Sequence, residues 1–306
     1  MIWPDGKQFA FTVFDDTDLA TLANVPPLYE FLHDLGFHTT KSVWPIRGHG
    51  TPSIDGATCE DQDYLSWLLQ LRNSGFEIGY HMAANTSSTR EKTIQALERF
   101  RELFGSYPST MANHSRNREN IYWGASRLSG PNRRLYNLAT AFRHMRSGRG
   151  HVETDPHFWG DICRDRITYC RSFVLPEINT LRLCPTLPYH DPDRPYVNYW
   201  FPSCEGPTVD SFVERISEQN QDRLESEYGA CIMYTHFACG FYENKQLNPR
   251  FRSLMQRLSR KNGWFVPVAT LLDYLRQQQK DHTITVTARS RLERNWLWLK
   301  LQKGTS

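Results

Sequence analysis

Two adjacent carboxylates end an apolar segment near the start of the chain. Residues 9–14 are apolar or β-prone, and Asp15 and Asp16 follow them directly within the sequence FTVFDDTD. Placed side by side, each carboxylate raises the cost of ionising the other unless a cation or a proton intervenes. A divalent cation resolves this conflict, because one Asp can bind the cation while its neighbour acts as a base.

Histidines end three further strand-like segments. His81 follows FEIGY, His236 follows CIMYT, and Asn113 and His114 end YPSTMANH. Carboxylate oxygens and imidazole nitrogens are suitable ligands for zinc or cobalt, with one coordination position left open for chemistry. Taken alone, a pair of Asp residues is more often a turn or a helix cap, and a single His is more often structural. The hypothesis of a metal site therefore rests on all four segments together.

The segments that must position these side chains alternate between strand-like and helix-like patterns. Such alternation predicts a parallel sheet or a barrel wrapped by helices, in which the carboxyl ends of the strands meet at one rim. We expect strands at residues 9–14, 37–45, 76–81, 107–114, 230–238 and 264–269, and helices at 26–36, 61–75, 93–105, 211–219, 250–263 and 270–279.

Two regions depart from this alternation. Residues 117–210 are irregular and rich in Pro, Arg and aromatic residues, with strand-like patterns at 167–175 and 180–187. Residues 278–306 carry two alternating apolar patterns, which predict a β-like C-terminal extension packed on the barrel. We therefore expect a catalytic domain at 1–277, with an irregular insertion at about 117–210, followed by the extension at 278–306.

Composition excludes some classes of partner. With 306 residues, of which 39% are hydrophobic, the chain can bury a large core, and its formal charge of +3 gives no reason to propose a nucleic-acid or membrane surface. We expect no membrane span, and a cytoplasmic protein, because the first residues lack a basic segment followed by an apolar one. The seven cysteines form no C-x-x-C pair and are expected to be free thiols. The sequence predicts no oligomeric state.

Several of these segments resemble the polysaccharide deacetylase family, also known as the NodB-homology or carbohydrate esterase four family. Residues 13–17, VFDDT, are similar to the family's T-F-D-D-G, and residues 75–81, GFEIGYH, are similar to its G-H-E-I-G-N-H. Weaker similarities lie at GSYP (105–108), at the strand IMYTH ending in His236, and at GWFVPVATLLDYL (263–275). The resemblance covers about residues 8–277.

The resemblance implies a distorted (β/α) barrel with fewer than eight strands that removes acetyl groups from acetamido sugars with the help of a divalent metal, most often zinc, with cobalt or nickel as alternatives. By this analogy Asp15 is the general base and His236 the general acid. Asp16 and His81 are then ligands of the metal.

The sequence departs from the family at two positions that bear on the site. The family's second metal-binding His is replaced by Asn85, whose amide oxygen is a weaker zinc ligand, so either Asn85 or His114 is the third metal ligand; otherwise Asn85, together with Asn113, is expected to contact substrate. His114 stands where the family's arginine motif is expected, and we expect it to be the third metal ligand, with substrate contact as the alternative. Because the family's arginine is missing, Asp15 has no expected partner to orient it unless Arg116 or Arg118 takes that role.

The sequence thus predicts a metal-dependent hydrolase of C–N amide bonds, most simply an N-deacetylase acting on an N-acetylated sugar or sugar precursor. Two alternatives remain open. One is a hydrolase of another linear amide on the same scaffold, since barrels change substrate by changing loops. The other is a catalytically inactive carbohydrate-binding protein, for which Asn85 and the missing arginine motif speak.

Overall fold

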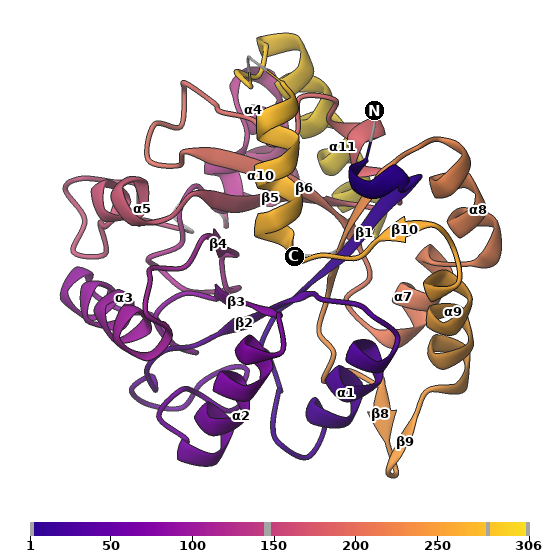
Figure 1. Ribbon diagram of the computed structural model, residues 1–306. Helices are drawn as coiled ribbons and strands as arrows, with labels where there is room; N and C mark the ends of the chain where they lie inside the picture. The colour runs from indigo at the N-terminus through magenta and orange to yellow at the C-terminus, as the bar shows by residue number, and fades with distance from the viewer. Residues whose placement is uncertain (1–2, 144–147, 280–281, 304–306) are drawn as a thin grey trace.

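A closed barrel of parallel strands forms the centre of the molecule. The computed structural model describes residues 3–143, 148–279 and 282–303. Within them, strands β1 to β7 pair in sequence order and β7 pairs again with β1, which closes the barrel (Figure 1). A further short strand, β10, pairs with the start of β1. The predicted distorted (β/α) barrel is confirmed.

The barrel strands are β1 (Phe9–Asp15), β2 (Thr40–Val43), β3 (Glu77–Tyr80), β4 (Thr110–Met111), β5 (Tyr169–Leu175), β6 (Tyr199–Glu205) and β7 (Ala230–Thr235), joined at the edge by β10 (Gly263–Trp264). Strands β8 (Tyr242–Glu243) and β9 (Gln246–Leu247) form a separate antiparallel hairpin. Almost every residue of the barrel strands is buried, as expected for parallel strands covered on both faces.

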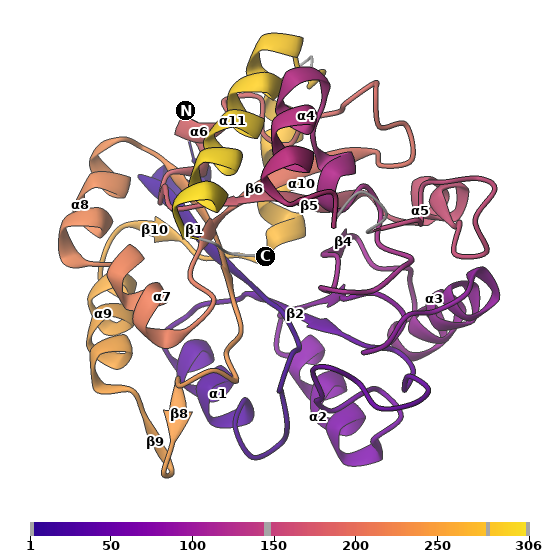
Figure 2. The same cartoon turned by 180° about the vertical axis from the view of Figure 1, so that it is seen from behind.

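Helices surround the barrel, as Figures 1 and 2 show from opposite sides. They are α1 (Pro26–Asp34), α2 (Gln62–Asn73), α3 (Arg90–Phe104), α4 (Gly130–Ala139), α5 (Gly160–Arg166), α6 (Thr180–Leu183), α7 (Val209–Arg215), α8 (Glu218–Ser226), α9 (Pro249–Ser259), α10 (Val268–Gln278) and α11 (Val286–Lys303), with short 3₁₀ turns η1 (Pro4–Gly6) and η2 (Gly124–Arg127).

Local sequence signals set several of the helix ends. Helices α1 and α9 each begin with proline in the first turn, where its missing N–H is not needed. The Asn248 side chain caps α9 by accepting hydrogen bonds from the backbone of Arg250 and Phe251. Helix α3 ends at Gly105, which has a left-handed φ of 76°.

The C-terminal extension is a helix, so the prediction of a β-like extension is wrong. Residues 286–303 form α11, whose start is capped by Thr285 Oγ1, which accepts a hydrogen bond from the backbone N–H of Ala288. Leu292, Trp296 and Leu299 are buried and lie near one helical face. Both views place α11 beside α4 (Figures 1 and 2).

The middle region is part of the barrel rather than an insertion into it. Residues 117–210 supply two barrel strands, β5 and β6, of which the sequence predicted only the first. The strand-like pattern at 180–187 is instead the short helix α6, whose first turn is capped by the Asn179 side chain.

No helix in the described part of the chain is both long enough and apolar enough to cross a membrane.

Candidate active site

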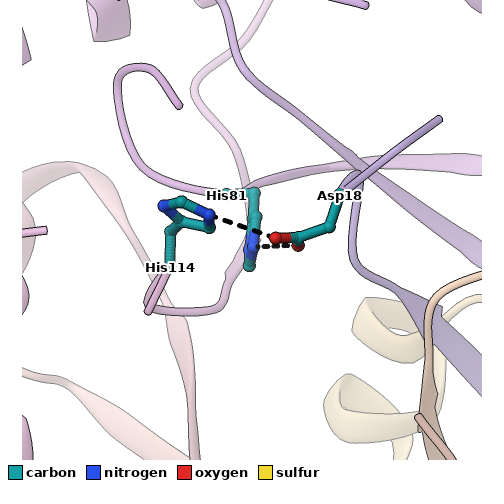
Figure 3. A group of neighbouring side chains, drawn as sticks. All are labelled: Asp18, His81 and His114. Carbon is teal, nitrogen blue, oxygen red and sulfur yellow. Dashed lines mark hydrogen bonds and ion pairs between the residues drawn. The ribbon is translucent and has the colours of Figure 1, made fainter. Parts of the chain in front are cut away.

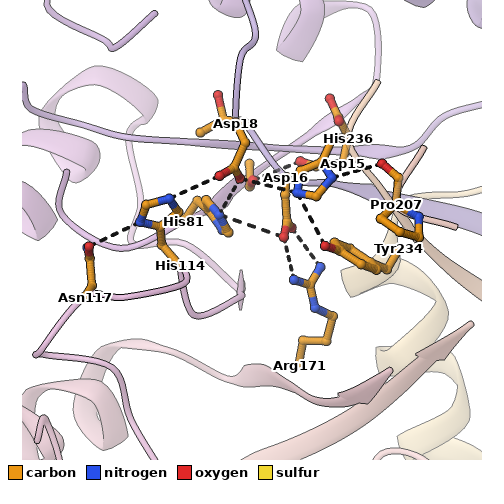
Figure 4. Close-up of polar contacts among 12 residues, drawn as sticks. Asp15, Asp16, Asp18, His81, His114, Asn117, Arg171, Pro207, Tyr234 and His236 are labelled. Carbon is orange, nitrogen blue, oxygen red and sulfur yellow. Dashed lines mark hydrogen bonds and ion pairs between the residues drawn. The ribbon is translucent and has the colours of Figure 1, made fainter. Parts of the chain in front are cut away.

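The carboxyl ends of the barrel strands bring the predicted site residues to one rim. Asp16 and Asp18 follow β1, His81 follows β3, His114 lies beyond the end of β4, and His236 follows β7. The β5 strand contributes Arg171 to the same place (Figure 4). These groups lie close together because parallel strands all point their carboxyl ends at one face.

The pleat of β1 sends its two adjacent carboxylates in opposite directions. Successive side chains on a strand alternate between its faces. Phe14 contacts Phe201 of β6, and Asp16, two residues on, bonds to Arg171 of β5. Asp15 instead bonds to Tyr29 of α1, in the outer helical layer. Only Asp16 therefore reaches the mouth of the barrel.

Asp15 lies outside the mouth and is saturated by polar partners. Its carboxylate accepts hydrogen bonds from Tyr29 Oη at 2.9 Å and from the backbone N–H of Phe237 at 2.8 Å, and Lys41 Nζ lies 2.9 Å from it. Burial alone would lower the pKa of Lys41, but the Asp15 carboxylate outweighs it and holds that pKa above its ordinary value. These contacts assign Asp15 to the link between β1, β2 and α1, in contrast to the role expected for it.

Asp16 is held by a two-pronged ion pair. Arg171 Nη1 and Nη2 lie 2.7 and 2.5 Å from its two carboxylate oxygens, and both side chains are buried. Burial alone would raise the pKa of Asp16, but Arg171 outweighs it and holds that pKa below its ordinary value. The arginine stacks over the ring of Tyr234 at 4.3 Å. Asp16 is therefore an oriented, ionised carboxylate at the mouth.

Asp18, which the sequence reasoning missed, is the carboxylate that both predicted imidazoles face. His81 Nε2 lies 3.0 Å from one of its oxygens and His114 Nε2 lies 3.1 Å from the other (Figure 3). The three ligand atoms lie within 4.8 Å of one another, and all three residues are buried. Burial alone would raise the pKa of Asp18, but the two histidines hold it well below its ordinary value.

The hydrogen bonds of His114 fit a cation between these groups. The Asn117 amide nitrogen donates to the backbone oxygens of Ala84 and Thr86 and to Glu119, so its oxygen, 3.2 Å from His114 Nδ1, must accept a proton from that nitrogen. Burial alone would lower the pKa of His114, but its hydrogen bond to Asp18 outweighs burial and raises that pKa, so the protonated ring donates to Asp18; in the neutral imidazole, Nε2 instead presents a lone pair to a carboxylate oxygen of Asp18. Two acceptors repel at this distance unless a proton or a cation lies between them, and a hydrogen bond from the far ring nitrogen is typical of metal-binding histidines.

A second group of potential ligands shares Asp18. Asp16, Asp18 and His236 also offer atoms within 4.8 Å of one another. Asp16, however, already faces the positive charge of Arg171 with both of its oxygens, which disfavours a second cation there. The group of Asp18, His81 and His114 is therefore the better metal site.

His236 lies at the edge of the site with one ring nitrogen facing the mouth. Its Nδ1 lies 3.0 Å from the backbone oxygen of Pro207 and so donates to it. Its Nε2 lies 3.6 Å from Asp18 and 3.4 Å from the Tyr234 hydroxyl (Figure 4). Its side chain is 19% exposed, against 1% for His81, so a substrate can reach it.

The two predicted substrate-binding amides have structural contacts. Asn85 accepts from the backbone N–H of Gly48 at 3.2 Å and donates to Asp55 at 3.2 Å, which ties two loops together. Asn113 pairs with both backbone groups of Ile121 at 2.9 Å. Asn113 lines the cavity described below, whereas Asn85 does not.

A cavity of about 1120 Å³, counting the space open to solvent, contains the groups at the mouth. Its lining includes Asp16, Asp18, His81, Arg171 and His236, together with Trp123, Arg127, Trp296 and Lys300. The last two belong to α11, so the C-terminal helix forms part of the wall. A cavity of this size accommodates a sugar or a molecule of similar size.

Backbone strain accompanies two of the candidate ligands. Leu19 and Met82, which directly follow Asp18 and His81, have left-handed φ values of 59° and 66°. Bulky side chains rarely adopt this conformation, which tends to occur at functional sites.

Two of the residues at this rim that were not predicted, Asp18 and Arg171, left some trace in the sequence. Asp18 follows Asp16 after one residue in FDDTD, and Arg171 is a charged residue within an otherwise apolar predicted strand. Neither Arg116 nor Arg118 has a contact with Asp15 in the described residues; Lys41 pairs with Asp15 and Arg171 with Asp16 instead.

No family model and no curated protein matches the chain, but solved structures resemble it. A Mycobacterium smegmatis protein assigned as a polysaccharide deacetylase aligns with a TM-score of 0.52 at 12% identity, over 93% of this chain and 96% of that one. A Pseudomonas aeruginosa PAO1 protein with the same assignment gives 0.53 at 11% identity, over 90% and 94%. PuuE allantoinase gives 0.51 at 13% identity, over 90% and 93%. The chain therefore has the fold of these polysaccharide deacetylase-like proteins.

Proposed function

We propose that this protein is a metal-dependent hydrolase of C–N amide bonds, and that its substrate is an N-acetylated sugar or sugar precursor. The observation that carries the proposal is the buried convergence of His81 and His114 on Asp18, beside an ionised Asp16 that Arg171 orients. The fold shared with polysaccharide deacetylase-like proteins supports the substrate class.

In this proposal Asp18, His81 and His114 hold the metal, and zinc suits this set of one oxygen and two nitrogen ligands, with cobalt or nickel as alternatives. A divalent cation at this place supplies Lewis-acid chemistry, since it polarises an amide carbonyl and makes water more acidic. The assignment moves the roles along the chain relative to the family resemblance, from Asp16 to Asp18 for the ligand and from Asp15 to Asp16 for the base.

The residues of the chain then divide the proton transfers between them. Asp16 removes a proton from the attacking water as the new C–O bond forms, and Arg171 keeps Asp16 ionised and correctly oriented for this step. His236 gives a proton from Nε2 to the amide nitrogen as the C–N bond breaks, while Nδ1 stays bonded to Pro207. The products are acetate and a free amine.

The test begins with metal analysis of the purified protein, followed by assay of acetate release from a panel of acetamido sugars. We expect about one zinc, cobalt or nickel per chain and measurable acetate release. Asp18→Ala should lose the metal. Asp16→Asn should keep the metal and lose activity by about 10²- to 10⁴-fold, the range of general-base catalysis. Asp15→Asn is the matched control, since it removes a neighbouring charge that does not reach the cavity; because this variant is expected to be less stable, its activity is compared per folded protein, as determined by a thermal melt.

Two results would overturn this proposal. A protein that binds none of these metals at micromolar concentration is not a hydrolase of this kind. An Asp16→Asn variant that turns over at the wild-type rate removes Asp16 from the mechanism.

A second candidate function is the hydrolysis of another linear or cyclic amide with the same groups. The fold shared with PuuE allantoinase favours including it. Allantoin and simple N-acyl amines therefore belong in the assay panel. If one of these compounds is hydrolysed and no sugar releases acetate, the substrate is an amide other than an acetamido sugar, and the proposed roles of the residues stay the same.

A further inference from the structure

Arg127, on the wall of the same cavity, is a partly buried cation that lacks an acidic partner. The other arginines that are largely buried each pair with a carboxylate: Arg171 with Asp16, and Arg194 and Arg289 both with Asp191. Among the described residues, no carboxylate lies within ion-pair distance of Arg127. Buried cations are normally paired, so this exception calls for an external partner.

Aromatic rings hold the Arg127 guanidinium in place. Its central carbon lies 3.5 Å from the ring centre of Trp123 and 5.5 Å from that of Trp296. Contact with an aromatic face stabilises a guanidinium and leaves its N–H edges free to donate. Both rings line the cavity as well.

A buried ion network fixes the backbone turn that carries Arg127. Arg194 Nη2 donates to the backbone oxygen of Arg127 at 2.5 Å and to Ser129 Oγ at 3.2 Å. Arg194 is held in turn by ion pairs with Asp191 and Glu293, both of which are 1% exposed. Arg127 thus lies on the wall of the cavity in a fixed turn, η2, rather than in a free loop.

Arg127 contributes a positive charge to this wall. Burial, followed by the nearby charge of Arg171, lowers the pKa of Arg127 to about 10, so its guanidinium stays charged at neutral pH. Lys300 of α11 lines the same cavity. The acidic side chains of the lining, Asp16, Asp18 and Glu205, have Arg171, the histidines and Arg215 as partners.

We propose that Arg127 binds an oxyanion of the substrate, a carboxylate or a phosphate, so that the protein acts on an amide compound carrying such a group and discriminates against its neutral counterpart. A planar guanidinium matches either oxyanion with two parallel hydrogen bonds. The inference rests on the proposed function for the identity of the reacting group, because the same cavity contains Asp18 and its two histidines.

The test compares binding of N-acetylglucosamine, its 1-phosphate and N-acetylmuramic acid by calorimetry, in the Asp16→Asn background to prevent turnover and in the presence of zinc, whether or not the protein takes it up. We expect the 1-phosphate or the carboxylate sugar to bind more tightly than the neutral sugar, and the better of the two identifies the oxyanion. Arg127→Gln should weaken the binding of that compound by about 10- to 100-fold, as expected for the loss of a charge-assisted pair of hydrogen bonds. Binding of the neutral sugar should not change.

Two variants control for structure and for charge. Arg127→Lys keeps the positive charge but loses the two parallel N–H donors of the guanidinium. Its affinity for the anionic sugar should therefore lie between those of Arg127→Gln and the wild type. Arg134→Ala removes an exposed positive charge from α4 and should change no affinity. A thermal melt of each variant checks that the η2 turn remains folded.

The outcomes separate this inference from the proposed function. Equal binding of neutral and anionic sugars, or an equal loss of both in Arg127→Gln, overturns the role of Arg127 even if acetate is released. If the protein binds no metal but still binds anionic sugars selectively through Arg127, the role of Arg127 is supported and the proposed hydrolase activity is rejected.

Discussion

Lys41 is buried with no exposure and has Asp15 as its acidic partner at 2.9 Å. Removing one member of a buried pair leaves the other as an uncompensated charge. We therefore predict that Asp15→Asn and Lys41→Met each lower the free energy of unfolding by about 3–5 kcal/mol. The double variant should lose much less than the sum, because it leaves no charge behind.

Urea unfolding of the four proteins completes this cycle, and metal content measured on the same samples is the control. Unchanged metal content in both single variants is expected, since neither side chain lines the cavity. Additive losses in the double variant would show that the two residues do not interact, and loss of metal in Asp15→Asn would return Asp15 to the site.

Glu119 gives the stability of the protein a dependence on pH. Its carboxylate accepts hydrogen bonds from Ser88 N–H at 3.0 Å and from the Asn117 amide at 2.9 Å, but burial outweighs them and raises its pKa from 4.5 to about 7. Between these two values the unfolded chain has released the proton while the folded protein keeps it. The stability contributed by this group therefore falls as pH rises from 4.5 to 7 and is constant above 7.

The Glu119→Gln variant has no titrating group at this position, so it lacks this pH-dependent contribution to stability. The difference in unfolding free energy, wild type minus variant, should fall by about 3 kcal/mol between pH 4.5 and pH 7.5, since each pKa unit corresponds to about 1.4 kcal/mol. Denaturant titrations at several pH values measure it. A difference that stays constant with pH would mean that Glu119 ionises in the folded protein as it does in the unfolded chain.

At the scale of elements, the C-terminal helix is the clearest departure from what the sequence predicted. Trp296 and Trp298 would share one face of a strand, whereas in a helix two residues apart point to nearly opposite sides. In α11 Trp296 is 3% exposed and packs on Tyr136 and Phe173, while Trp298 is 64% exposed. We predict that Trp296→Ala lowers the free energy of unfolding by about 3–5 kcal/mol.

Trp298→Ala is the matched control on the same helix, and its effect should stay within about 0.5 kcal/mol. Chemical unfolding of both variants checks the prediction. Comparable losses from the two substitutions would favour the strand pairing that the alternation of apolar residues suggested.

These elements also show why part of the fold and of the site could be predicted from the sequence. Strand β1 and helix α1 carry local signals, namely a short apolar run and prolines followed by a helical apolar stripe. Helix α11 misled because residues such as Trp296 and Trp298 alternate over a few positions, and partners distant in sequence, Tyr136 and Phe173, decide which of them is buried.

In the candidate site, the position of the histidines at the rim could be predicted because each ends a strand-like segment. Which carboxylate faces the mouth could not, because a one-residue change in the alignment with a family motif exchanges the two faces of a strand. Asp15 bonds to Tyr29 of α1, and only the closed barrel shows that Asp16 and Asp18 meet the imidazoles.

At the scale of the whole molecule, the proposed metal site joins segments that are far apart in the chain. Asp18, His81 and His114 follow three different strands, and His114 lies 96 residues from Asp18 in sequence. The unfolded chain has no such site, so under this proposal a metal bound there would add directly to the stability of the fold. With free metal at about 100 times its dissociation constant, the gain is about 2.7 kcal/mol.

For a chain of 306 residues, this gain corresponds to a rise in Tm of about 4 °C, given an unfolding entropy of about 2 cal/mol/K per residue. We predict that a chelator lowers the Tm of the wild type by about this amount and that added zinc restores it. In Asp18→Asn neither treatment should change the Tm, because the shared carboxylate is lost, whereas Arg134→Ala should respond as the wild type does. If the protein contains metal but its wild-type Tm does not change with chelator, the metal does not stabilise the folded state and is not bound at this site. If the chelator lowers the Tm of Asp18→Asn as much as that of the wild type, the stabilising metal is bound by other residues.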